Sequence, residues 1–520
     1  MKKILISSLA ASLLLFTYSC DTDFENDVND IPVTSGTADF SRFISIGNSL
    51  TSGYRDGALY RQGQIESFPN MIATQMKLAG GGDFNIPLMA DELGGIPSIG
   101  FPNKRVLNSS LGLDFAEGTG ATTLQNIYSS GPYHNMGVPG AKSYHLVIPG
   151  YGNPANLAIG MANPYFVRFA KDPATSSVLS DAMSLQPTFF SLWIGNNDVL
   201  SYATNGGMNS QSAGGATLYT PAVVQTGNTN PATYAANDIS DPQLVGAAIK
   251  AVLDGLKSVG ASKGVIANIP DVTTIPHFTR VRYNEISLDA ATAQTLNTSL
   301  YQPLKAALTF LGAGDRFELV NAGQNPVIIV DNSLQNVSAQ LTAVLSANGY
   351  PAQQAAFLGS AFGQARQAKP GELILLTAAN ELGKDALTGQ APTATSQFIV
   401  GASFPLHDRF SLTATEISNI STAVTAYNQV ISGLATTYGL ALVNANGKMA
   451  DLHTQSGIQF DGVKYTTTFV TGGTFSLDGV HLTGRGYAII GNEFIKAINN
   501  KYGSNLPQVN VNSYSGVTFP

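Results

Sequence analysis

Short apolar runs along the chain are each followed by Gly, Asn or Pro, which is typical of buried strands that end at a turn. These runs predict strands at residues 42–47, 188–195, 264–270 and 440–446. Between them, apolar residues recur with the period of a helix, and this predicts helices at residues 67–79, 241–260, 414–439 and 484–503. The alternation of strands and helices predicts an α/β fold with a largely parallel sheet.

Two regions fall outside this alternation. Residues 199–237 contain no charged residue and no histidine, so we expect a polar surface loop over about 199–240. A region at about 280–400 contains helix-period stretches of its own and predicts a largely helical insertion that forms a subdomain or lid. The main domain is then expected over residues 41–503, with a C-terminal tail at 504–520.

The N-terminus has the pattern of a lipoprotein signal peptide. Two lysines precede an apolar run at 4–16 that is too short to cross a bilayer, and Cys20 follows it. We expect residues 1–20 to be the signal, lipidated at Cys20, and residues 21–40 to be a flexible acidic tether. An acidic run after the cysteine resembles the surface-export signal of Bacteroidetes-type lipoproteins.

This pattern predicts an exported protein that is anchored by lipid in the outer membrane of a Gram-negative bacterium, on its periplasmic or cell-surface face. The alternative is that Cys20 is an incidental buried thiol.

Composition narrows the classes of function. With 44% hydrophobic and 12% charged residues, the chain is expected to fold. The formal net charge of −7 and the pI near 5.4 leave no basic surface for nucleic acid, which is therefore not an expected partner. A single cysteine excludes a disulfide within the chain.

The first predicted strand ends abruptly at G-N-S-L, residues 47–50, which places Ser49 at the strand's carboxyl end. A serine hydroxyl becomes a nucleophile only when a base takes its proton and a third group orients that base. His481 and Asp478 offer such a pair in a D-x-x-H stretch before the last predicted helix. Taken alone, D-x-x-H is usually structural, and Ser49 is better explained as the N-cap of a helix that begins at Leu50.

Two further stretches supply donors for the oxyanion of a tetrahedral intermediate. The strand predicted at 188–195 is followed by Asn196-Asn197-Asp198, so the Asn197 amide is expected at its carboxyl end. Gly140 lies in the stretch NMGVPGAKS, where the absence of a Cβ lets a backbone N–H approach a ligand closely.

The four stretches, in this order, resemble the blocks of the SGNH (GDSL-type) hydrolase superfamily: a serine after the first strand, a glycine, an asparagine in G-x-N-D, and D-x-x-H near the end. The resemblance implies a three-layer α/β/α flavodoxin-like fold with a short parallel sheet. It implies that Ser49 is the nucleophile, His481 the general base and Asp478 its orienting acid. The Ser49 N–H, the Gly140 N–H and the Asn197 side chain would form the oxyanion hole, and no metal or organic cofactor is implied.

The resemblance also implies hydrolysis of carboxylic esters through an acyl-enzyme, with a lipid or short-acyl ester as substrate. Carbohydrate O-acetyl esterase activity is the alternative, because the family includes deacetylases. Asn48 stands where the family usually has Asp, so a catalytically degenerate, glycan-binding lipoprotein is a second alternative. Asp56, just beyond the nucleophile, and His277, after a predicted strand, are candidate substrate contacts.

Overall fold

The computed structural model describes residues 32–213 and 215–520. The expected signal peptide, Cys20 and most of the expected tether lie outside these residues. Five short strands form a central, entirely parallel sheet. They are β1 (Phe43–Gly47), β4 (Asn135–Gly137), β5 (Phe189–Trp193), β8 (Lys263–Ala267) and β15 (Ala441–Val443). The expected α/β fold with a parallel sheet is therefore confirmed.

The winding of the chain reverses at the middle of the sheet. The strands lie side by side in the order β15-β8-β5-β1-β4. The chain runs from β1 to β4 on one side and then crosses to β5 on the other, so the reversal falls between β1 and β5. Numbered along the chain, this is the order 2-1-3-4-5 of doubly wound sheets, in which ligands bind beyond the carboxyl ends of the strands at that reversal.

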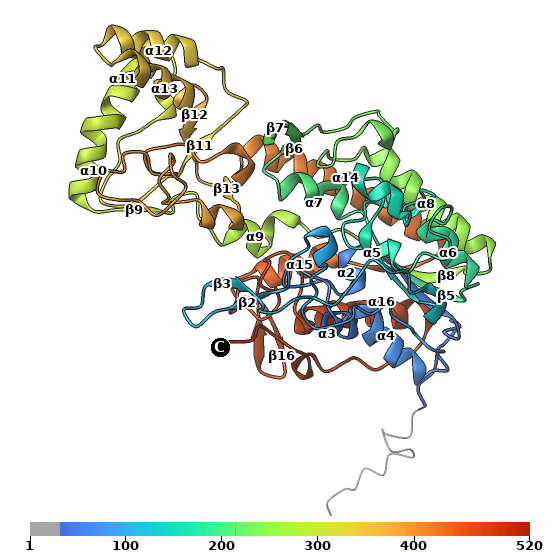
Figure 1. The fold of residues 1–520 in the computed structure, drawn as a ribbon. Coiled ribbons are helices and arrows are strands. Elements are labelled where there is room, and N and C mark those ends of the chain that lie inside the picture. The colour runs from blue at the N-terminus through green and yellow to red at the C-terminus, as the bar shows by residue number, and fades with distance from the viewer. Residues whose placement is uncertain (1–31, 214) are drawn as a thin grey trace, which may run out of the picture.

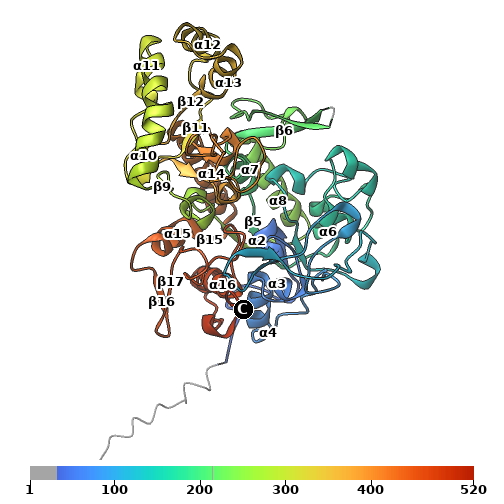
Figure 2. The same cartoon turned by 60° about the vertical axis from the view of Figure 1, so that its left-hand side comes forward.

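Helices cover both faces of the sheet (Figures 1 and 2). One face is covered by α4 (Phe68–Lys77) and α16 (Gly484–Tyr502), and the other by α6 (Val178–Ser184), α8 (Pro242–Ser258) and α14 (Ala414–Tyr438). Aromatic rings fill the first interface, where the centroid of Phe68 lies 5.7 Å from that of Trp193 and 4.6 Å from that of Phe494. Burial of each such side chain stabilises the fold by about 1.5–3 kcal/mol, so this layered core is the main source of stability.

Shorter elements connect these layers. They are α2 (Ser49–Ser52), α3 (Arg61–Ile65), α5 (Pro164–Val167), α7 (Asn197–Ala203), α9 (Pro276–Thr279), α15 (Ala445–His453) and the antiparallel pairs β2 (Arg105–Leu107) with β3 (Leu113–Phe115) and β16 (Ile458–Phe460) with β17 (Val463–Tyr465). The four predicted strands and the four predicted helices of the main domain all occur, with bounds that differ by a few residues. The sequence did not predict β4, because three residues are too few to form an apolar run.

The uncharged region that was expected to be a surface loop contains a hairpin that this prediction missed. Strand β6 (Met208–Ala213) pairs antiparallel with β7 (Ala216–Pro221). The buried Asp238 carboxylate closes the base of the hairpin, because it accepts hydrogen bonds from the Asn209 amide at 3.0 Å and the Gln225 amide at 2.7 Å. Asp238, the first charged residue after the uncharged stretch, therefore joins the two ends of the hairpin.

Residues 281–412 form what we call the insertion lobe, which lies beyond α9 at the upper left of Figure 1. It has apolar cores of its own, one of them around Tyr301, Phe317 and Phe362. Its elements are α10 (Ala290–Leu296), a π-helix (Asn297–Tyr301), α11 (Gln302–Phe310), α12 (Ser338–Ala347), α13 (Ala352–Phe362), and the pairs β9 (Ile286–Leu288) with β10 (Gly323–Asn325), β11 (Ile328–Val330) with β12 (Ala365–Gln367), and β13 (Leu373–Ile374) with β14 (Ser411–Leu412). The lobe therefore combines helices with small antiparallel sheets.

Both ends of the described chain pack on the main domain. Phe40 is buried, and the Thr37 N–H donates to the Tyr502 carbonyl at 2.8 Å, so the last part of the expected tether is docked against α16. The expected C-terminal tail is also held, because Val509 and Val511 are buried. Within residues 32–213 and 215–520, no helix has both the length and the apolar character needed to cross a membrane.

Gly264→Ala should lower the free energy of unfolding by about 1–3 kcal/mol, because a Cβ there would lie 2.7 Å from three atoms of the buried Phe190 ring. Gly433→Ala is the matched control. It lies on an exposed face of α14 with nothing within 4 Å of the new Cβ, and it should raise this free energy by about 0.5–1 kcal/mol. Urea unfolding followed by circular dichroism measures both variants, and equal midpoints would contradict the tight packing at β8.

Candidate active site

A tight turn after β1 positions the Ser49 hydroxyl. A Cβ on Gly47 would lie 2.4 Å from the carbonyl oxygen of Trp193, so only glycine fits at the end of the strand. Asn48 then caps α2, because its Oδ1 accepts the Leu50 N–H at 3.1 Å. The explanation of Ser49 as the helix cap is therefore wrong, since the neighbouring asparagine is the N-cap.

Ser49, His481 and Asp478 form a hydrogen-bonded chain, although the first two are 432 positions apart. His481 Nε2 lies 2.9 Å from Ser49 Oγ, and His481 Nδ1 lies 2.8 Å from Asp478 Oδ2. A carboxylate only accepts hydrogen bonds, so the Nδ1 proton points to Asp478 and the Nε2 lone pair faces the serine hydroxyl. In this tautomer the imidazole can take the serine proton.

Backbone N–H groups hold the Asp478 carboxylate in place. Its Oδ1 accepts those of Val480 and His481, each at 2.8 Å, and its Oδ2 accepts that of Gly57 at 3.0 Å. Burial alone would raise the pKa of Asp478, but the His481 imidazole and the N–H groups of His481 and Val480 outweigh it and hold the pKa well below its ordinary value. The carboxylate therefore stays ionised and orients the imidazole.

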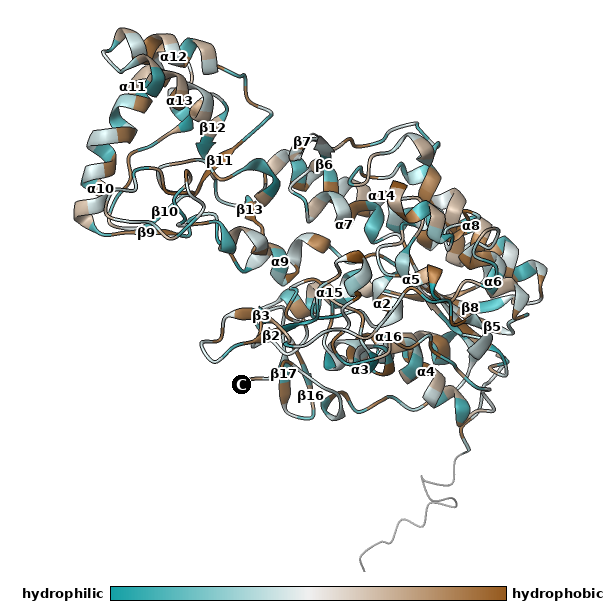
Figure 3. Ribbon diagram, in the orientation of Figure 1, coloured by the Kyte–Doolittle hydropathy of each residue, from teal (hydrophilic) through white to brown (hydrophobic). Residues whose placement is uncertain are grey.

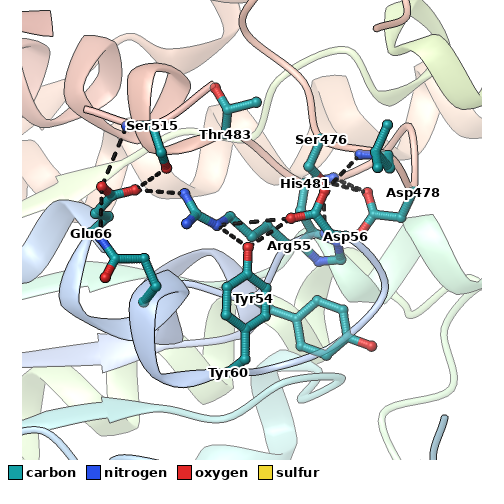
Figure 4. A network of polar contacts seen from close by, with 12 residues as sticks. Tyr54, Arg55, Asp56, Tyr60, Glu66, Ser476, Asp478, His481, Thr483 and Ser515 are labelled. Carbon is teal, nitrogen blue, oxygen red and sulfur yellow. Dashed lines mark hydrogen bonds and ion pairs between the residues drawn. The ribbon is translucent and has the colours of Figure 1, made fainter. Parts of the chain in front are cut away.

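Asp56, expected to contact substrate, does not line the cavity at the candidate nucleophile. Its Oδ1 accepts the Leu477 N–H at 3.0 Å and its Oδ2 accepts the Tyr60 hydroxyl at 2.7 Å. Its own N–H donates to Ser476 Oγ at 2.9 Å, and Figure 4 shows these contacts together. Asp56 thus fixes residues 476–481, which we call the acid–base loop.

A buried ion pair anchors the other side of this network (Figure 4). Arg55 Nη1 lies 2.8 Å from Glu66 Oε2, and Arg55 Nε donates to the Tyr60 hydroxyl at 2.6 Å. The Ser515 hydroxyl also donates to Glu66. Removal of one partner of such a pair leaves an uncompensated charge and typically costs about 3–5 kcal/mol. No sequence motif indicates these residues, because neither Arg55 nor Glu66 belongs to one.

The turn that contains Gly140 is tied to the end of β1. The Val138 N–H donates to the Gly47 carbonyl at 2.9 Å, and the Ala141 N–H closes the turn on the Val138 carbonyl at 3.1 Å. Gly140 is the third residue of this four-residue turn and has φ +81°. A type II turn requires this left-handed conformation at its third position, which glycine adopts readily. Asn197 Nδ2 donates to the Ala141 carbonyl at 3.0 Å, so the amide lies against the same turn.

The expected oxyanion donors retain hydrogens that no group of the described chain accepts. Within residues 32–213 and 215–520, the backbone N–H groups of Ser49 and Gly140 have no acceptor. The Asn197 amide uses one N–H on the turn and lines the same cavity as Ser49, which leaves its second N–H for a ligand. These donors therefore lie at one end of the sheet and can bind a developing negative charge.

Asp198 joins α7 to the Gly140 turn, and the sequence analysis missed it although it follows Asn197 directly. Its carboxylate accepts the Ser143 N–H at 2.8 Å and the Ser143 hydroxyl at 2.9 Å. The side chain is fully buried, and burial raises the pKa of Asp198. Asp198 thus fixes the position of α7 relative to the Gly140 turn.

Asn48 also bonds the turn after β5. Its Nδ2 donates to Asn196 Oδ1 at 3.1 Å while its Oδ1 caps α2. An ionised aspartate can accept but cannot donate, so an amide suits a position that must do both. Asn48 therefore uses both ends of its amide in this buried network.

A small apolar cavity opens at Ser49, with a volume of about 60 Å³. Apolar side chains make up most of its wall, namely Leu50, Trp193, Leu200, Val272, Ile275, Met449, Phe475 and Leu482. A cavity needs about 10–15 Å³ of such space to hold one water, so this one has room for a group of only a few heavy atoms. Among the described residues, no three His, Cys, Asp or Glu side chains gather as metal ligands.

His277, the other expected substrate contact, does not line this cavity either. Its N–H donates to the Gly479 carbonyl at 2.9 Å, which supports the acid–base loop. The ring is buried, and neither ring nitrogen has a hydrogen-bond partner in the described part of the chain. Burial lowers the pKa of His277 to about 4, so the imidazole is neutral at neutral pH.

No protein-family model matches this chain, and no curated protein matches its sequence. The resemblance to the SGNH hydrolases is therefore supported by the four sequence blocks and by their positions in the fold.

The stability of the fold should depend on the charge of Asp478. Its pKa is depressed in the folded protein, so its stabilising contribution is present above about pH 4 and is lost as the pH falls from there toward the folded pKa. The wild type should lose unfolding free energy between about pH 5 and pH 3, and Asp478→Asn should lose less over this interval. Urea unfolding across the range measures both slopes, and identical slopes would contradict this role.

Proposed function

We propose that this protein is a serine ester hydrolase of the SGNH type, which cleaves carboxylic esters through an acyl-enzyme. The observation that carries the proposal is the chain of hydrogen bonds from Ser49 Oγ through His481 to Asp478, at 2.9 Å and 2.8 Å. Such a chain supplies a nucleophile, its base and the acid that orients the base. The position of Ser49 after β1, beside the reversal of strand order, supports the same proposal.

In the proposed reaction, Ser49 Oγ attacks the ester carbonyl carbon while its proton passes to His481 Nε2. The bond to the alcohol oxygen then breaks, and the alcohol leaves with that proton. Water next attacks the acyl-enzyme and gives a proton to His481. The bond to Ser49 Oγ breaks, the serine recovers the proton, and the carboxylic acid is released. Asp478 stays ionised throughout.

The oxyanion would accept hydrogen bonds from the N–H groups of Ser49 and Gly140 and from the Asn197 amide. One well-placed donor of this kind is worth about 3–4 kcal/mol of transition-state stabilisation. The bonds from Ser143 to Asp198 hold the donors in place before substrate binds. The donors therefore need little reorganisation as charge develops on the carbonyl oxygen.

The volume of the cavity at Ser49 favours esters of short acyl groups. A space of about 60 Å³ encloses an acetyl or similarly small group and leaves the alcohol part of the ester outside. The same observation favours carbohydrate O-acetyl esterase activity as the second candidate, because acetyl is among the smallest acyl groups.

We also propose that the protein is exported and is anchored by lipid at Cys20 in a Gram-negative outer membrane. The support is the signal-like pattern of residues 1–20, with its short apolar run before the cysteine.

Ser49→Ala should lower kcat/KM for nitrophenyl acetate by at least about 10⁴-fold, because the nucleophile is lost. Ser333→Ala is the matched control, since Ser333 stands in the same Asn-Ser-Leu tripeptide but its hydroxyl donates to Asp331 at 2.5 Å. A fluorophosphonate probe should label the wild type and Ser333→Ala but not Ser49→Ala. A folded wild-type protein that the probe fails to label would contradict the proposal.

The acyl cavity should set the preference for chain length. Nitrophenyl acetate and butyrate should be hydrolysed at least about 10-fold faster than the octanoate, as judged by kcat/KM, because a long chain does not fit. Leu200→Ala, which enlarges the cavity, should narrow this ratio, whereas Leu434→Ala, at a half-buried position away from the cavity, should not. A wild-type enzyme that prefers the octanoate would refute the short-acyl assignment.

A further inference from the structure

A second cavity lies in the insertion lobe. Its volume is about 910 Å³, which is within the range of small-molecule sites. It is bounded by the junction of α10 with α11, by α13 and by the segment 382–403. It shares no lining residue with the cavity at Ser49. The two cavities are therefore separate sites. Figure 1 shows α9 between the lobe and α2.

The wall of the lobe cavity is largely apolar and nearly free of charge. Glu285 is the one charged side chain among the described residues that line it. Half-buried apolar side chains face the space, chief among them Ile286, Leu288, Leu296, Leu300, Leu382 and Phe398. Serine, threonine and glutamine side chains supply most of the other polar groups. The wall therefore suits an uncharged ligand with an apolar portion.

A π-helix shapes one side of this cavity. Asn297 begins it and is held by Val320, whose carbonyl accepts from Asn297 Nδ2 at 2.8 Å and whose N–H donates to Asn297 Oδ1 at 2.9 Å. Leu296 and Leu300, four positions apart, face the cavity on either side of that residue. Hydrophobic residues are spaced among hydrophilic ones along this helical stretch (Figure 3). Short π-helical insertions are frequent at functional sites, and this one begins between Leu296 and Leu300, which both line the cavity.

We propose that the lobe cavity binds a neutral amphiphile through its aliphatic chain, of which a monoacylglycerol is the simplest example. Aliphatic surface left in water costs about 25 cal/mol per Å², and an aliphatic chain recovers that free energy when it covers the leucines. A carbohydrate presents hydroxyl groups and would recover little of it. The hydroxyl and amide side chains can bind an uncharged head group, and no Lys or Arg of the described chain lines the cavity to pair with an anionic one.

This binding needs no reaction at Ser49, so it is independent of the proposed esterase activity. The cavity at Ser49, of about 60 Å³, is also too small to hold the same chain. A protein that carries Ser49→Ala therefore leaves the ligand intact, and variants of the cavity wall assign the binding to the lobe cavity.

The test uses the whole chain with Ser49→Ala and N-phenyl-1-naphthylamine, an uncharged fluorophore that brightens in apolar surroundings. The fluorophore should bind, and monolauroylglycerol below its aggregation concentration should displace it. Thr295→Trp fills the cavity from an exposed helix position, and Leu300→Gln removes aliphatic wall. Each should weaken the binding of monolauroylglycerol by at least about 10-fold.

Phe310→Gln is the matched control, because Phe310 is 80% exposed on α11 and lies outside the cavity wall. The affinity of this variant for monolauroylglycerol should equal that of the parent protein with Ser49→Ala alone. Thermal unfolding identifies the variants that are folded, and Thr295→Trp decides the outcome if Leu300→Gln unfolds. Unchanged affinity in folded Thr295→Trp overturns the proposal. Displacement by a neutral xylooligosaccharide and not by monolauroylglycerol also overturns it.

Discussion

The hydrogen bond between Ser49 and His481 joins the turn after the first strand to the loop before the last helix, and the geometry of the site depends on it. It forms because β1 lies beside the central strand β5, where the winding reverses, and because the loop before α16 reaches the carboxyl end of β1. The fold thereby brings a hydroxyl and an imidazole together that are 432 positions apart. A serine elsewhere in the fold would lack the imidazole of His481 as a partner.

A second layer of buried polar groups keeps this bond in place. Asp56 holds the acid–base loop through Leu477 and Ser476, and the Arg55–Glu66 ion pair holds the same region from its other side. On the opposite wall of the site, Asp198 links α7 to the Gly140 turn through Ser143. Each of these acids is satisfied by hydrogen bonds or a cation, so together they support one arrangement of the proposed nucleophile, base and oxyanion donors.

Periodicity predicted the layered fold well, because β1, β5, β8 and the long helices are apolar enough to leave a clear pattern. Strand β4 and the β6–β7 hairpin left no such pattern, since the first has three residues and the second is a polar pair whose base is closed by Asp238, outside the uncharged stretch. Ser49, His481 and Asp478 were predicted from their motif blocks. The residues that support them were not predicted, because closeness in sequence does not show which way a side chain points. Asp56 lies near Ser49 in sequence, and yet its carboxylate turns toward the acid–base loop.

The proposed mechanism requires Ser49 to carry the acyl group during turnover. Peptide mass spectrometry of the protein, quenched in acid while it hydrolyses nitrophenyl acetate, detects that intermediate directly. One acetyl group is expected on the peptide that contains Ser49, attached at that serine. Turnover without an adduct on Ser49, or with the acetyl group on another residue, would contradict it.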